Sequence, residues 1–112
     1  MKEALQKNQS KDKCKCLITN AMSVIGGKWK PVILYRLYNG INRFGMLQRS
    51  INDISKSMLT KQLREMESHK ILNRKIFAEM PPRVEYTLTK KGESLIPVFK
   101  NLLDWAKIYQ ND

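Results

Sequence analysis

Residues 55–70 have the sequence SKSMLTKQLREMESHK, which predicts one helix with two unlike faces. At about 100° per residue, Leu59, Leu63 and Met66 fall on one side, at the spacing of a buried stripe. The opposite side carries hydroxyl groups and cations but no carboxylate: Ser57, Thr60, Lys61, Arg64 and Ser68. Such a helix suits the DNA major groove, which admits a helix and presents hydrogen-bond acceptors. The alternative is a surface helix with a solvated polar face.

The chain has a large excess of positive charge. Its 112 residues include 21 lysines and arginines against 10 aspartates and glutamates, a formal net charge of +11. A small domain with this charge attracts polyanions, so we favour nucleic acid over an anionic membrane surface or a merely solubilising role. The apolar content of 42% predicts one globular domain with a modest core.

The sequence predicts a cytoplasmic protein without cofactor or metal. No apolar run approaches the ~18 residues of a membrane span, and the polar residues 1–16 do not resemble a secretory signal. Reduced thiols are therefore expected. Cys14, Cys16 and His69 are too few to close a four-ligand zinc site within one chain. A metal site shared across a dimer is a weaker alternative.

Local signals predict three helices before a tight turn and a fourth after it. A polar lead-in of residues 1–13 precedes a helix from Leu17 to Ile25, which Gly26-Gly27 should end. A second helix has Pro31 in its first turn and stops at Gly40. A short helix spans residues 43–50, and after residues 52–54 Ser55 caps the central helix. Helix, short turn and amphipathic helix together form a helix-turn-helix.

After Leu72 the apolar period changes to two. Residues 74–80 and 83–88 are predicted strands, separated by Pro81-Pro82, which have no amide hydrogen to pair. A hairpin at about 73–88, directly after a helix-turn-helix, is a wing. The expected fold is therefore mainly α with a small β-hairpin (α+β), in one domain covering residues 14–112.

The last helix should begin at Thr89 and be kinked or split by Pro97. Beyond Pro97 the apolar residues cover more than one face, which is typical of a partner interface. We predict a homodimer, although a helix folded back on its own domain is the alternative. The predicted interface residues are Leu17, Ile18, Val98, Leu102, Trp105 and Tyr109.

Several segments carry a family resemblance through their order and spacing. Cys16 is followed ten residues later by Gly26-Gly27-Lys28-Trp29, then by Arg43-Phe44, SKSMLTKQLREME at 55–67 and PPRVEYTLTKKG at 81–92. Over residues 16 to about 105 the chain resembles the HxlR-type regulators, a branch of the MarR-like winged-helix bacterial transcription factors. It departs from them at Leu17, where the family usually has proline, and at Asn52-Asp53, where Pro-Gly is frequent.

The resemblance implies a dimeric, DNA-binding repressor or activator that is not an enzyme. Its central helix, about 55–69, would enter the major groove of a palindromic operator, and its wing would touch the flanking backbone. We expect Ser57, Thr60, Lys61 and Arg64 to face base edges and nearby phosphates. Phosphate contacts and register are expected from the following residues: Arg43, Ser55, Lys56, Arg74, Lys75 and Arg83.

Cys16 occupies the position at which some members resembling this chain sense oxidants or electrophiles. Lys13 and Lys15 beside it would favour the thiolate. No cysteine follows residue 16, so only Cys14, Cys16 and their symmetry mates could be linked. The alternative is two thiols without a role.

The sequence is also compatible with a bound effector or with a partner other than DNA. A small-molecule effector would have Trp29, Tyr35, Phe99 and Trp105 as candidate walls, although core positions are the default for these aromatic residues. A basic winged helix that binds protein or RNA without regulating a promoter is the competing function. The sequence contains neither a phosphate-binding glycine loop nor a paired-carboxylate motif, so an enzymatic function is disfavoured.

Overall fold

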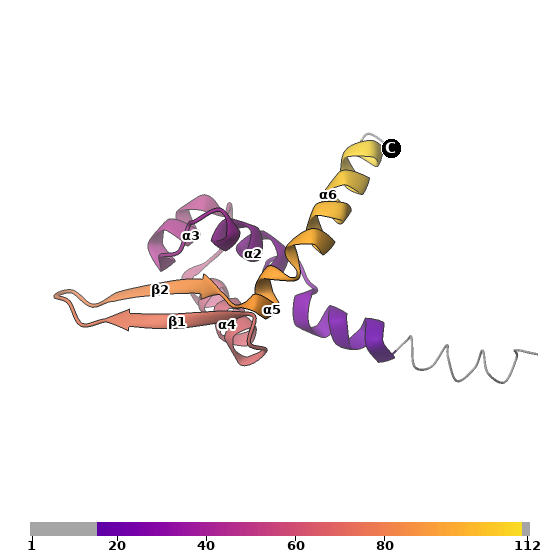
Figure 1. The fold of residues 1–112 in the computed structure, drawn as a ribbon. Coiled ribbons are helices and arrows are strands. Elements are labelled where there is room, and N and C mark those ends of the chain that lie inside the picture. Colours follow the sequence, from indigo (N-terminus) through magenta and orange to yellow (C-terminus); the bar gives the residue numbers. More distant parts are fainter. Residues whose placement is uncertain (1–15, 111–112) are drawn as a thin grey trace, which may run out of the picture.

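The computed structural model describes residues 16–110, which are mainly helical with one two-stranded sheet (Figure 1). Residues 16–25 form a first helix. The later elements are α2 (Lys30–Tyr38), α3 (Phe44–Ser50), α4 (Lys56–Ser68), β1 (Leu72–Phe77), β2 (Arg83–Leu88), α5 (Lys90–Glu93) and α6 (Ile96–Tyr109). This order confirms the predicted winged helix-turn-helix. Within the described residues, no helix has the length and apolar character needed to cross a membrane.

The junction between α3 and α4 follows from local signals. The turn passes through Asp53, whose φ of 67° lies in the left-handed region that aspartate tolerates. The Ser55 hydroxyl then accepts a hydrogen bond from the Met58 amide at 3.0 Å, which confirms the predicted cap. These two features fix where α4 begins and therefore which residues lie on its outer face.

The inner face of α4 lies in the centre of the core. Leu59, Leu63 and Met66 are 0%, 2% and 1% exposed, which confirms the predicted apolar stripe. They belong to a cluster of eight fully buried side chains contributed by α2, α3, α4 and the start of the wing: Ile33, Leu34, Leu47, Leu59, Leu63, Met66, Ile71 and Leu72. Because this stripe is buried, the opposite face of α4 points away from the core.

The wing consists of β1, β2 and the loop between them. The strands are antiparallel, paired from Leu72–Leu88 to Phe77–Arg83. The first strand therefore starts two residues earlier and ends three residues sooner than predicted, because the two prolines cannot extend the pairing. An isolated bridge between Arg43 and Glu85 joins the wing to the entrance of α3.

The C-terminal segment is divided by a turn. The Thr89 hydroxyl accepts from the Gly92 amide at 3.0 Å, which confirms it as the cap of α5. The chain turns at residues 94–95, and Pro97 stands in the first turn of α6, so the expected split occurs. In Figure 1, α6 and the helix of residues 16–25 both point away from the other helices.

Candidate nucleic-acid interface

The outer face of α4 carries the side chains predicted to read DNA. Ser57, Lys61 and Arg64 are exposed, and Thr60 is half-buried. The Thr60 hydroxyl donates to the Lys56 carbonyl at 2.8 Å, so one of its hydrogen-bonding directions is already used within the helix. Along the described part of the chain, no carboxylate lies within ion-pair distance of Lys56, Lys61 or Arg64. These three cations are therefore available to an anionic partner.

Both carboxylates of α4 have cationic partners from other elements. Lys30 at the start of α2 donates to Glu65 Oε1 at 2.7 Å, and Arg74 Nε of β1 lies 3.8 Å from Glu67 Oε1. Lys30 is the single buried charged side chain among residues 16–110. Sequence reasoning missed the Lys30–Glu65 pair, because nothing local connects residues 35 positions apart. The pairing reduces the repulsion that α4 would otherwise exert on phosphate groups.

The Lys30–Glu65 pair predicts a pH-dependent contribution to stability. The hydrogen bond from Lys30 lowers the pKa of the Glu65 carboxyl below its usual value of 4.5. This contribution is present above the unfolded pKa and is lost as pH falls through the lower folded pKa. We expect Glu65→Gln to lower the unfolding free energy by about 1 kcal/mol at pH 7, a modest value because the Glu65 side chain is 41% exposed. The difference from wild type should vanish in acid.

Urea denaturation from pH 7 to pH 3 measures this difference. Glu67→Gln is the matched control, because the longer Glu67–Arg74 pair has two substantially exposed partners and should contribute at most a few tenths of a kcal/mol. An equal loss in both variants, or a loss independent of pH, would contradict a specific role for Lys30.

Two guanidinium groups, one at the entrance of α3 and one on β2, lie beside Glu85 of the wing. Arg43 Nε lies 3.8 Å and Arg83 Nη1 3.4 Å from Glu85 Oε2, and Arg83 Nη2 also lies 3.0 Å from Glu79 Oε2. Arg83 further stacks over the Phe77 ring at 4.0 Å. Its charge is therefore balanced inside the wing, whereas Lys75 has no carboxylate within ion-pair distance in residues 16–110.

The base of the wing lies against α4. Burial raises the pKa of the Tyr86 hydroxyl of β2, while Arg74 and Arg64 act in the opposite direction. Arg74 Nε of β1 lies 3.8 Å from Glu67 Oε1 of α4, so an ion pair joins the wing to this helix.

Comparison with known proteins identifies the family. Residues 24–112 match the HxlR-like helix-turn-helix family. The chain belongs to this family. A HTH-type transcriptional regulator from Methanothermobacter thermautotrophicus, itself uncharacterized, is 46% identical over 98 residues, which cover 88% of this chain and 75% of the relative. This HxlR-like protein is therefore a helix-turn-helix transcriptional regulator.

Solved structures support the same assignment. The HTH-type regulator YtcD, also a curated relative from Bacillus subtilis, matches with a TM-score of 0.81 and 41% identity, over 86% of this chain and 98% of YtcD. The reduced form of the redox regulator HypR matches with a TM-score of 0.80 and 36% identity, over 84% of this chain and 93% of HypR. YodB from B. subtilis, in its reduced form, has a TM-score of 0.71 and 38% identity, over 79% and 86% of the two chains.

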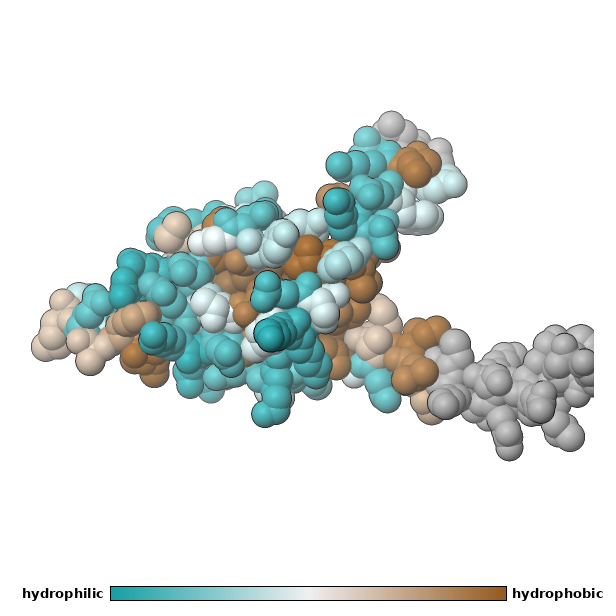
Figure 2. Space-filling view, viewed as in Figure 1, coloured by the Kyte–Doolittle hydropathy of each residue, from teal (hydrophilic) through white to brown (hydrophobic). Residues whose placement is uncertain are grey.

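The terminal helices of this HxlR-like regulator expose apolar side chains. The six predicted interface residues and Ile108 are all 49–72% exposed. They are Leu17, Ile18, Val98, Leu102, Trp105, Ile108 and Tyr109. Figure 2 shows brown, hydrophobic surface between the base of α6 and the helices beside it. The expected core position is wrong for Trp105, which is 60% exposed, because α6 projects beyond the core.

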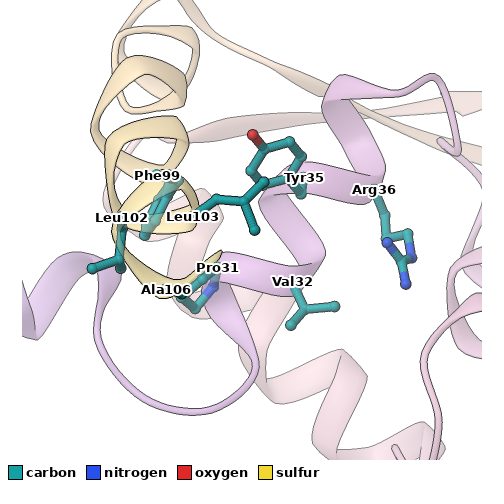
Figure 3. A pocket seen from close by; sticks show the side chains of 8 residues that line it. All are labelled: Pro31, Val32, Tyr35, Arg36, Phe99, Leu102, Leu103 and Ala106. Carbon is teal, nitrogen blue, oxygen red and sulfur yellow. The ribbon is translucent and has the colours of Figure 1, made fainter. Parts of the chain in front are cut away.

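A groove of about 440 Å³ runs between α2 and α6 (Figure 3). Tyr35 and Phe99 line it, as the effector hypothesis expected, together with Pro31, Leu102 and Leu103. Trp105 lines a neighbouring hollow, whereas Trp29 packs against the core. The groove is continuous with the exposed apolar side of α6.

Only part of the predicted thiol site lies within the structure. Cys16 is an exposed free thiol, and Cys14, Lys13 and Lys15 lie outside the described residues. His69 follows the last turn of α4 as its C-cap. Among the described residues, no three histidine, cysteine or acidic side chains are grouped as metal ligands.

Proposed function

We propose that this protein is a homodimeric, sequence-specific DNA-binding regulator, acting as a repressor. The observation that carries the proposal is the outer face of α4. Its exposed cations have no ion-pair partner among residues 16–110, while both carboxylates of the helix are paired with other elements. A basic helix without unbalanced negative charge can enter the major groove.

The residues divide into two groups by position. Ser57, Thr60, Lys61 and Arg64 on α4 read base edges and nearby phosphates. Phosphate contacts around them position the protein and supply most of the affinity. These contacts come from Ser55, Lys56, Arg43, Arg74 and Lys75, with Arg83 compensating the wing carboxylates beside them.

A second copy of the chain covers the exposed apolar surface of the terminal helices. An apolar surface of this extent is unusual on a monomer and typical of an interface. A two-fold dimer would place two copies of α4 on one side, which matches a palindromic operator with half-sites about 34–36 Å apart.

Selection of duplexes from a random-sequence pool, followed by footprinting, tests the proposal. We expect an inverted repeat with two protected major-groove segments about one helical turn apart. Binding that is equal for all duplexes, or tighter for RNA, would instead favour the alternative of a basic interaction module without promoter specificity.

Lys75→Ala should weaken binding to all duplexes alike. Lys75 is an exposed cation of β1 without a carboxylate partner in the described structure, so it should act by displacing counterions. We expect the slope of log K against log salt to flatten by about one unit per site. Fluorescence anisotropy titrations from low to high salt measure this slope. Lys107→Ala on α6 removes the same charge away from α4 and should leave the slope unchanged; an equal effect of both variants would exclude a direct contact.

A thiol response is a second proposal, supported by the exposure of Cys16 and by the likeness to HypR and YodB. HypR is described as a redox regulator, and its oxidised form also matches this chain. Two thiols would join as a disulfide between subunits while an added oxidant such as diamide takes up two electrons and two protons.

Diamide treatment should give a covalent dimer on a non-reducing gel, reversed by dithiothreitol, and should change the affinity for the selected duplex. Cys16→Ser should abolish both effects, whereas Cys14→Ser should retain them. A covalent dimer that forms equally in Cys16→Ser would assign the reaction to the other thiol, and the absence of any band would end the proposal.

A further inference from the structure

The wing tip, which we define as residues 78–82, is an exposed apolar element. Its sequence is Ala78-Glu79-Met80-Pro81-Pro82, and the Met80 side chain is 97% exposed. In Figure 1 the wing tip extends beyond the helices, and Figure 2 shows tan spheres at this end of the molecule, beyond the teal surface of the strands. No element within residues 16–110 covers Met80.

The charge of the wing tip is cancelled internally. Glu79 is its single charged residue, and its carboxylate forms an ion pair with Arg83 Nη2 at 3.0 Å. Arg83 is further held by Glu85 at 3.4 Å and by the face of Phe77. The wing tip therefore presents neither a free cation for a phosphate group nor an unbalanced anion that DNA would repel.

The backbone of the wing tip is also restricted. Two successive prolines restrict its backbone, and the Glu79 amide donates to the Phe77 carbonyl at 2.9 Å. At the base, the Tyr86 amide donates to the Asn42 carbonyl at 2.9 Å, which ties β2 to the segment before α3. A hairpin ordered in advance loses little conformational entropy when it binds.

The length of the wing fits the spacing of DNA grooves. Each strand has six residues and spans about 20 Å at roughly 3.3 Å per residue. With α4 in the major groove, the adjacent minor groove is centred about half a helical turn away, or roughly 17 Å. The wing is thus long enough for its tip to reach the minor groove that flanks a sequence read by α4.

We propose that Met80 is an apolar minor-groove contact that selects A·T over G·C base pairs flanking each half-site. Methionine and proline are among the apolar side chains that minor-groove proteins insert at base steps from the minor groove. The guanine 2-amino group occupies the floor of this groove, and an apolar side chain cannot accept its hydrogen bond. This inference rests on the proposed DNA-binding function and assigns a specificity-determining residue to it.

Base-pair replacement in the flank of the selected duplex tests the inference. Inosine·cytosine has the minor-groove face of A·T and a major-groove face close to that of G·C. We expect wild type to bind G·C flanks about 5- to 20-fold more weakly than A·T flanks, and I·C flanks to restore binding. Met80→Ala should reduce this discrimination to within about twofold and leave the salt slope unchanged, since no charge is removed.

Ile76→Ala is the matched control, because Ile76 is an apolar side chain of β1, 61% exposed, outside the wing tip. It should retain the full flank preference. Discrimination that survives in Met80→Ala, or that follows the major-groove rather than the minor-groove face of I·C, would overturn the assignment of Met80 while leaving the proposed function intact. Failure to select any duplex would overturn both the assignment and the proposed function.

Discussion

Leu102→Asp is expected to convert the protein to a monomer and to weaken binding to the two-half-site duplex at least about 100-fold, because linked half-sites bind far more tightly than separate ones. Leu102 is 55% exposed and lines both apolar hollows beside α6. A carboxylate at this position would lose its hydration in a dimer interface without gaining a partner. Light scattering gives the oligomeric state, and anisotropy gives the affinity.

A duplex with a single half-site separates the two effects of this substitution. Wild type and Leu102→Asp should bind it equally, since α4 and the wing are unchanged. Asn39→Asp, at the exposed end of α2, adds the same negative charge away from α6 and should remain dimeric. A variant that stays dimeric and binds both duplexes like wild type would show that the exposed side of α6 is not the subunit interface.

The parts of the fold that the sequence predicted are those set by local signals. The stripe of Leu59, Leu63 and Met66 is buried as its spacing requires, and the hydroxyls of Ser55 and Thr89 cap the helices that follow them. Each of these features depends on residues within one or two helical turns. The order helix, turn, helix and hairpin then leaves little choice of architecture.

The bounds of the wing were less predictable, because they depend on pairing between strands. Leu72 belongs to β1 through its position opposite Leu88, although the apolar period of two that predicted the strand begins only after Leu72. Residues 78–80 had the alternation of a strand. They are not paired, because Pro81 and Pro82 displace the start of β2 to Arg83.

The sequence did not predict which charged side chains are buried or form ion pairs. A count of cations treats Arg83 and Lys75 alike, yet Arg83 is bound to two carboxylates and Lys75 to none among the described residues. In the sequence Lys30 does not differ from the other lysines, but in the structure it is buried and paired with Glu65 of α4. These differences arise from contacts between distant segments, which single-sequence patterns do not encode.

Arg64→Ala is expected to cost about 1–3 kcal/mol of specific binding, or roughly 5- to 150-fold in affinity, if the guanidinium pairs with a guanine. Arg64 is exposed on the outer face of α4 and has no carboxylate within ion-pair distance in residues 16–110, so its donors are free. Competition titrations of the selected duplex against random duplex measure the specific part. Discrimination should be lost at one base pair per half-site.

Arg64→Lys separates the role of geometry from that of charge. Lysine keeps the positive charge but lacks the planar fork that binds two acceptors of one guanine. Arg64→Lys should therefore retain the affinity for random duplex and the salt slope, while losing most of the discrimination at the same base pair. If Arg64→Ala instead weakens specific and random duplexes by the same factor, Arg64 contacts phosphate. If neither substitution changes binding, the outer face of α4 does not read the bases.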